Sequence, residues 1–264
     1  MQRGGTVLGT ARSTEFATPN GQERAVRRLA EAGIEGLVVI GGNGSLAGGM
    51  RLGERGVAAV GLPATIDNDV WGTDTAIGVD TALNTALEAI DRIKDTASSH
   101  RRAHVVEVMG RDCGYLALMS AIAGGAEVAV VPEVELRPEP LVLHIKKAYE
   151  QGKSHFIVVV AEGAPFTAEE VHDYVNGVEG AYDSRLTVMG HIQRGGNPTA
   201  SDRILASRLG YAAVEALVEE DYGKMVGVRG ESIERVPLEE VAGKSRPLDP
   251  GLYKMAEVFA ELPE

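Results

Sequence analysis

The chain has 264 residues, a formal net charge of −12 at pH 7, 33 glycines and a single cysteine, Cys113. The acidic balance argues against nucleic acid as the main partner, and one cysteine excludes an intramolecular disulfide and suits a reducing cytoplasm. No apolar run approaches the ~18 residues of a membrane-spanning helix, and the first residues do not resemble a secretory leader, so we expect no membrane partner. This length and glycine content fit one large or two small α/β domains.

Helical and strand patterns alternate along the chain, which is typical of parallel sheets covered by helices. The expected helices cover residues 22–32, 82–96, 112–123, 138–151, 168–175, 201–219 and 252–262. The expected strands cover residues 37–40, 57–62, 104–109, 128–131, 155–161, 186–189 and 225–229. The clearest helix is 82–96, where Leu83, Leu87, Ile90 and Ile93 form one apolar stripe.

A glycine turn follows the first of these strands. Gly41, Gly42 and Gly44 come directly after the apolar run, and Ser45 can cap the helix that follows. Ligands of open α/β sheets bind beyond the carboxyl ends of the strands, and the N–H groups at a helix start attract phosphate. This turn is therefore a candidate phosphate site.

The second strand leads into a loop that holds Thr65, Asp67 and Asp69. Two carboxylates beside a phosphate site suggest one proton acceptor and one metal ligand. The loop could instead be only a turn shaped by Asp and Asn side chains. With the glycine turn just upstream, we favour a phosphoryl-transfer site.

Four motifs in order, GGNGS, TIDND, MGR and GHIQRGG, resemble the phosphofructokinase family. The resemblance runs from Gly4 to Gly210 and implies two doubly wound, Rossmann-like domains with mainly parallel sheets and a ligand cleft between them. It implies a nucleotide-binding domain of residues 1–79 with 198–246, and a sugar-phosphate domain of residues 80–197 with 247–264. The first residues resemble the interior of the family, so we expect about sixty residues, roughly two β–α units, to be lacking.

The resemblance implies glycolytic phosphoryl transfer from MgATP to the C1 hydroxyl of fructose 6-phosphate. Asp67 is then the base, Thr65 contacts the sugar, and Mg²⁺ is held by Asp69 with Asn43. The implied ATP contacts are Arg12, Gly42, Asn43, Gly44, Ser45 and Gly48.

The same resemblance implies a set of sugar-phosphate contacts, with Arg111 also stabilising the transferring group. These contacts are Thr65, Asp67, Asp69, Met109, Gly110, Arg111, Glu162, His191 and Arg194. Arg102 and Arg185 are implied to reach a neighbouring subunit's substrate, which makes the expected assembly a homotetramer with shared active sites. Their plainer interpretation is a pair of solvated charges.

Three positions bear on the alternatives. Asn43 stands where the family usually has a metal-binding aspartate, so we expect weaker but retained magnesium binding. Gly44 and Ala64 are small where pyrophosphate-using relatives tend to carry an acid and a lysine, so we favour ATP over pyrophosphate. A second alternative is a catalytically impaired fragment or regulatory-type subunit that binds sugar phosphate without turnover. Cys113 is interpreted as a packing residue.

Overall fold

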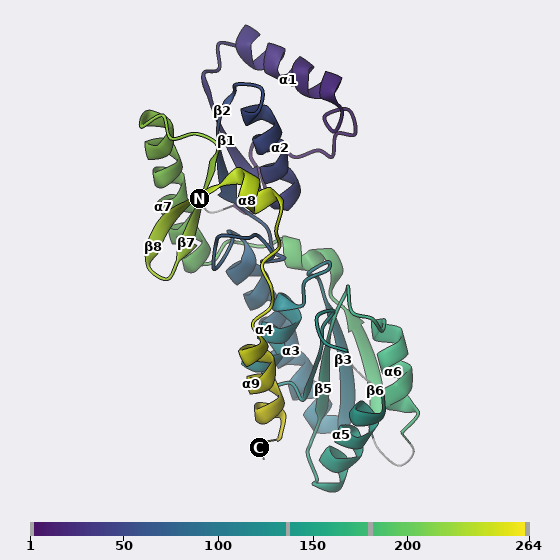
Figure 1. The fold of residues 1–264 in the computed structure, drawn as a ribbon. Coiled ribbons are helices and arrows are strands. Elements are labelled where there is room, and N and C mark those ends of the chain that lie inside the picture. Colours follow the sequence, from purple (N-terminus) through teal and green to yellow (C-terminus); the bar gives the residue numbers. More distant parts are fainter. Residues whose placement is uncertain (1–2, 136–137, 179–181, 262–264) are drawn as a thin grey trace. The chain divides into compact units, whose positions relative to one another are not determined.

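A computed structural model describes residues 3–135, 138–178 and 182–261 (Figure 1). The chain forms two compact units, Met1–Val79 with Asn197–Arg246 and Asp80–Gly196 with Pro247–Glu264. Each unit contains one four-stranded sheet with a hydrophobic core on each face. No helix in the described ranges is both long enough and apolar enough to cross a membrane.

The first unit has a sheet of order β1-β2-β7-β8, parallel except for the antiparallel pair β7 and β8. Its elements are α1 (Pro19–Glu31), β1 (Gly36–Gly41), α2 (Asn43–Gly53), β2 (Ala58–Pro63), α7 (Ala200–Val218), β7 (Lys224–Arg229), β8 (Ser232–Pro237) and α8 (Leu238–Ala242).

Helices cover both faces of this sheet. On one face, Leu46 of α2 and Leu238 of α8 pack with Met225 of β7. On the other face, Leu209 of α7 packs with Val60 of β2. Because both faces of β2 are covered, its sequence is a continuous apolar run instead of an alternating one.

The second unit has a sheet of order β4-β5-β3-β6 in which every pair is parallel. Its elements are α3 (Val79–His100), β3 (Arg102–Val108), α4 (Tyr115–Gly124), β4 (Val128–Val130), α5 (Pro138–Glu150), β5 (Phe156–Ala161), α6 (Ala168–Asn176), β6 (Asp183–Val188), the 3-10 helix η1 (Gly190–Arg194) and α9 (Pro250–Glu261).

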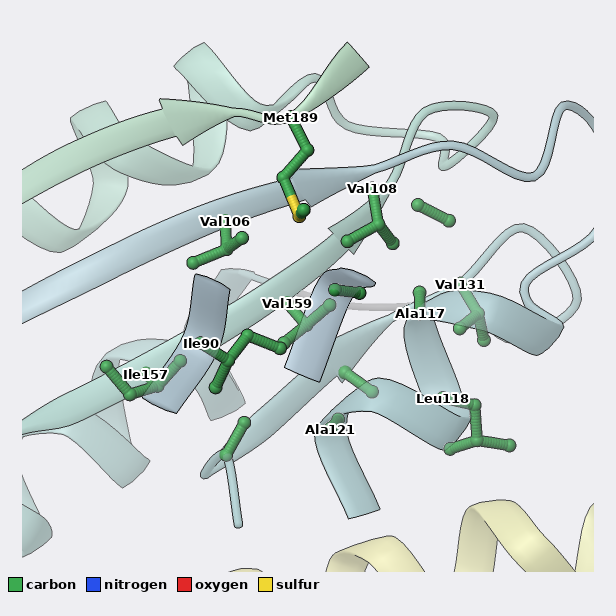
Figure 2. Packing of buried hydrophobic residues seen from close by; sticks show 14 of the residues in the cluster. Ile90, Val106, Val108, Ala117, Leu118, Ala121, Val131, Ile157, Val159 and Met189 are labelled. Atoms are coloured by element: carbon green, nitrogen blue, oxygen red, sulfur yellow. The ribbon is translucent and has the colours of Figure 1, made fainter. Parts of the chain in front are cut away.

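Successive side chains of β5 point alternately into the two hydrophobic cores of this unit. Ile157 and Val159 lie in the core that includes Ile90 of α3 and Leu118 of α4, which Figure 2 shows at close range. Phe156 and Val158 point to the opposite core, beside α5 and α6. The central strand is therefore buried on both sides and holds the loops at its ends in place.

The predicted α/β fold with mainly parallel sheets is confirmed. Several local expectations are wrong. The helices expected from residues 22 and 82 begin earlier, at Pro19 and Val79. The helix expected from residue 112 begins at Tyr115, because Cys113 N–H bonds back to the Gly110 carbonyl in a turn. The strand expected from residue 186 begins at Asp183, and β8 with α8 was not predicted at all.

Candidate active site

In the first unit, the loops after β1 and β2 lie at the same edge of the sheet. The parallel register pairs Gly41 with Pro63, and the N–H of Ala64 donates to the carbonyl of Gly41 at 3.0 Å. A Cβ atom on Gly42 would lie 3.3 Å from Cβ of Thr65. The glycine turn and the TIDND loop are therefore in direct contact, with Gly42 allowing the close approach.

Helix α2 begins within the glycine turn. Its N-cap is Gly42, which is extended and makes no side-chain cap, so the expected cap by Ser45 is wrong. Ser45 lies in the first turn, where its N–H bonds to the Gly42 carbonyl at 2.9 Å. The first N–H groups of a helix have no partner within it and carry the positive end of the helix dipole.

The free space around the glycines differs along the first turns of α2. A Cβ atom on Gly44 would meet nothing within 4 Å, whereas one on Gly48 would lie 3.1 Å from the Phe16 ring. The positive helix end at Gly44 is thus open to a ligand, and Gly48 is a packing position.

Asn43 and Asp69 connect the two loops. The side-chain N–H of Asn43 donates to Oδ2 of Asp69 at 2.8 Å, while the buried Oδ1 of Asn43 has no hydrogen-bond partner among the described residues. One carboxylate and one amide oxygen form a sparse metal site. It fits Mg²⁺, which commonly binds through one or two carboxylates plus substrate phosphates. The described residues hold no group of three or more His, Cys, Asp or Glu side chains that could bind a metal by themselves.

Asp67 lies in the same loop and is only 6% exposed. Its N–H donates to the Thr65 hydroxyl at 3.2 Å. The next residue, Asn68, has a φ of 57° and anchors the loop, since its side-chain oxygen accepts from Ala76 N–H and its amide donates to the Asp74 carbonyl. The loop is therefore fixed by its own side chains, with Asp67 largely shielded from water.

In the second unit, a turn of three residues follows β3. Met109 and Gly110 are buried and Arg111 is exposed. Oε1 of Glu162, at the end of β5, accepts from Arg111 N–H at 2.6 Å and from Gly110 N–H at 3.3 Å. Glu162 therefore holds the backbone that presents the Arg111 side chain.

The 3-10 helix η1 follows β6 at the same sheet edge. His191 and Arg194 are exposed on it, and Gln193 is 1% exposed. Oε1 of Gln193 accepts from Met109 N–H at 2.7 Å. The structure thus joins η1 to the turn after β3 through a glutamine that the sequence analysis did not single out.

Arg102 and Arg185 lie at the opposite end of the strands. They belong to the first half of β3 and of β6, and both approach Asp183, at 3.6 Å and 2.9 Å. With a rise of about 3.3 Å per residue, the length of β3 separates Arg102 from Arg111 by about 20 Å. The structure therefore does not bring this pair to the Arg111 turn of the same unit.

Two titratable groups of β3 have shifted pKa values. Burial, followed by the carboxylates of Glu169 and Glu162, raises the pKa of Glu107. Burial, followed by the positive charge of Arg185, lowers the pKa of His104. Negative charge thus gathers near the carboxyl end of β3 and positive charge near its start.

Two features lie apart from these loops. Arg12 belongs to an exposed segment without helix or strand, residues 3–15. A cavity of about 280 Å³ in the second unit is lined by Glu127, Lys153 and Phe156, at the start of β4 and β5 and away from the carboxyl ends.

The first unit combines an α/β fold with an uncovered helix N-terminus beside carboxylates. This combination is typical of proteins that bind phosphorylated ligands. The family model described as phosphofructokinase matches residues 1–217. Proteins named ATP-dependent 6-phosphofructokinase from Natranaerobius thermophilus and Shouchella clausii are each 48% identical over 257 residues, which is 97% of this chain and 80% of the relative. The chain belongs to the phosphofructokinase family.

Solved structures agree with this assignment. Phosphofructokinase from Saccharomyces cerevisiae matches with a TM-score of 0.83 and 37% identity, covering 92% of this chain and 36% of that one. A pyrophosphate-dependent phosphofructokinase from Marinobacter aquaeolei matches with a TM-score of 0.82 but only 23% identity, covering 93% of this chain and 68% of that one, and shows the shared fold alone.

Proposed function

We propose that the chain is an ATP-dependent 6-phosphofructokinase that works in glycolysis in the cytoplasm. It transfers the γ-phosphoryl group of ATP to the C1 hydroxyl of fructose 6-phosphate and releases fructose 1,6-bisphosphate and ADP. The observation that carries this proposal is the 48% identity to relatives of that name, extending over 97% of the chain. The single buried cysteine suits the proposed compartment.

Asp67 is the proposed base. The C1 hydroxyl gives its proton to the Asp67 carboxylate, its oxygen bonds to the γ-phosphorus, and the bond from that phosphorus to the ADP oxygen breaks. Support comes from its place beside the glycine turn and from its low exposure of 6%, which limits competition by water. Thr65, whose hydroxyl bonds the Asp67 backbone, would contact the sugar.

The start of α2 is the proposed phosphate site for ATP. Its N–H groups attract anions, and the open space at Gly44 admits a nucleotide. Gly42, Ser45 and Gly48 belong to the same turn and helix, and Arg12 is assigned to ATP by family resemblance. Asn43 and Asp69 would hold Mg²⁺, which when bound neutralises phosphate charge.

The turn after β3 and the helix η1 are the proposed sugar-phosphate site. Arg111 offers a planar set of donors to the transferring group, and His191 and Arg194 are exposed at the same sheet edge. Met109, Gly110 and Glu162 form the turn itself, with Glu162 available to a sugar hydroxyl on its exposed side. Asp69 completes the set from the first unit.

Shared active sites in a homotetramer are part of the proposal. Arg102 lies about 20 Å from the Arg111 turn of its own unit, and Arg185, which pairs with His104, lies about 13 Å from the end of β3, so both suit a substrate held by a neighbouring copy better than their own. Fructose 6-phosphate and ATP are the proposed small-molecule partners.

The test compares the chain with its Asp67→Asn variant in a coupled ADP assay. Loss of a general base should lower kcat about 10²- to 10⁴-fold while binding of fructose 6-phosphate, measured by calorimetry, is kept. Asp91→Asn is the control, because Asp91 is an exposed carboxylate of α3. A wild-type kcat in Asp67→Asn would remove Asp67 from the mechanism.

Assays of the wild-type chain identify the phosphoryl donor and show whether the chain is catalytically active. Phosphorylation with pyrophosphate but not with ATP would replace the proposed donor. Binding of fructose 6-phosphate without turnover by either donor would favour the impaired fragment or regulatory-type subunit.

A further inference from the structure

Three successive N–H groups of the turn after β3 are bound by two side chains from different parts of the chain. Gln193 accepts from Met109 at 2.7 Å, and Glu162 accepts from Gly110 at 3.3 Å and from Arg111 at 2.6 Å. A turn normally satisfies such groups through its own backbone or water. Here Glu162 directly follows the neighbouring strand β5, and Gln193 lies in η1, which follows the other neighbouring strand, β6.

The backbone of this turn needs that support. Arg111 has a φ of 53° and Gly110 a φ of 153°, and a non-glycine residue in the left-handed region persists only when its surroundings hold it there. A Cβ atom on Gly163 would lie 1.9 Å from the Arg111 carbonyl oxygen, so the end of β5 is pressed against the turn. The direction of the Arg111 side chain depends on these contacts.

Gln193 is the buried member of an otherwise exposed helix. It is 1% exposed, whereas His191 and Arg194 on either side are exposed. Its Nε2 atom is buried and has no hydrogen-bond partner among the described residues. A buried amide with an unsatisfied donor is costly, and what this amide supplies in return is the acceptor for the Met109 N–H.

We propose that Gln193 is a positioning residue: its oxygen fixes the Met109 amide and thereby sets the Arg111 turn relative to the η1 side chains His191 and Arg194. The inference rests on the proposed function, because it assigns those three side chains to the sugar phosphate and the transferring group. A glutamine oxygen is needed because the alternative leaves the Met109 N–H buried without an acceptor.

The experiment removes the amide in two ways: Gln193→Met keeps the length of the side chain, and Gln193→Leu is one atom shorter. Misplacing reacting groups by about 1 Å can cost about 100-fold, so we expect kcat/KM for fructose 6-phosphate to fall about 10- to 100-fold. Both a lower kcat, through Arg111, and a higher KM for the sugar, through His191 and Arg194, are expected, with KM for ATP unchanged.

The control is Tyr182→Phe, which removes a part-buried hydrogen bond of the same unit, from the hydroxyl of the buried Tyr182 to the Lys153 carbonyl. It should lower the melting temperature as much as the Gln193 variants do and leave kcat/KM unchanged. A folded Gln193 variant with wild-type kcat/KM would overturn the proposal.

A second measurement does not depend on turnover, and its wild-type part does not depend on the variants. In the wild-type chain the Met109 amide should exchange its hydrogen as slowly as the amides within β3, and in Gln193→Met much faster. Rapid exchange of Met109 in the wild type would overturn the proposed contact. Absence of any wild-type turnover would instead count against the proposed function and leave the exchange result standing.

Discussion

At the scale of single residues, the contact between Asn43 and Asp69 governs the charge beside the glycine turn. The amide donates to the carboxylate at 2.8 Å, so Asp69 is stabilised without a second negative charge. An aspartate at position 43 would place two carboxylates at this distance and exchange a hydrogen bond for repulsion. The same pair would be a stronger magnesium ligand set.

Asn43→Asp should therefore have opposite effects without and with metal. Without Mg²⁺ the free energy of unfolding should fall by about 1–2 kcal/mol, and the affinity for Mg²⁺ should rise about tenfold. Thermal unfolding and calorimetric titration of Mg²⁺ measure the two effects. Asn84→Asp is the matched control, since it adds the same charge on an exposed face of α3. No gain in Mg²⁺ affinity would remove Asn43 from the metal site.

His104 makes stability depend on pH. Its Nε2 lies 2.9 Å from the Thr187 hydroxyl, and burial, followed by Arg185, lowers its pKa below 6.5. A histidine with a lowered folded pKa contributes stability above the unfolded pKa and loses it as pH falls through the folded pKa. His104→Gln should therefore lose less melting temperature than the wild type between about pH 7.5 and pH 5. His100→Gln, an exposed histidine of α3, should behave as the wild type; equal acid sensitivity in His104→Gln would contradict the assignment.

At the scale of elements, continuous apolar runs predicted β1, β2 and β5 well, because both faces of β2 and β5 are buried and β1 is an apolar strand that is partly buried. Strand β8 was not predicted because Ser232–Pro237 is half-buried and largely polar. Its pairing with β7 depends on a two-residue turn in which Gly230 has a φ of 56°. The sequence could place the glycine turn and the TIDND loop at one edge. It could not show which atoms of Asn43 and Gln193 are bound, because those partners lie 26 and 84 residues away.

Two neighbouring elements of the first unit leave apolar surface uncovered. Strand β1 is an edge strand without lysine or proline, and Leu217 of α7 packs near its Gly36. Helix α7 exposes an apolar stripe in which every residue is more than half exposed, namely Ile204, Tyr211, Val214 and Val218. Unprotected edges and apolar stripes of this kind promote association between chains.

Adding charge to the apolar stripe should reduce that association. The double variant Val214→Lys with Val218→Lys is expected to lower self-association at least about tenfold in sedimentation velocity while leaving the melting temperature within about 2 °C, because both side chains already face solvent. Val7→Lys is the control, as Val7 is exposed in a segment apart from the stripe. Unchanged sedimentation of the double variant would show that the stripe is not a contact surface.

At the scale of the whole molecule, the residues of the proposed reaction are divided between the two units. Asp67 and the phosphate site belong to the first, and Arg111 with η1 belongs to the second. Arg102 and Arg185 add a further division, because they lie in the first halves of β3 and β6 whereas Arg111 follows the end of β3. If each active site takes Arg111 from one chain and Arg185 from another, the chains must assemble before they can act.

Mixed assemblies test this division. Under the proposed assignment, Arg111→Ala and Arg185→Ala should each be nearly inactive alone, since each lacks a cation assigned to the substrate. When the two variants are co-expressed with different tags and purified through both, sites that take Arg111 from one chain and Arg185 from the other regain both cations. If the chains assort freely, about a quarter of the sites are restored. Recovery of about that fraction of wild-type kcat supports shared sites. Mixed assemblies that stay inactive would show that both arginines act on the substrate of their own chain, since no site in the mixture would then hold the pair.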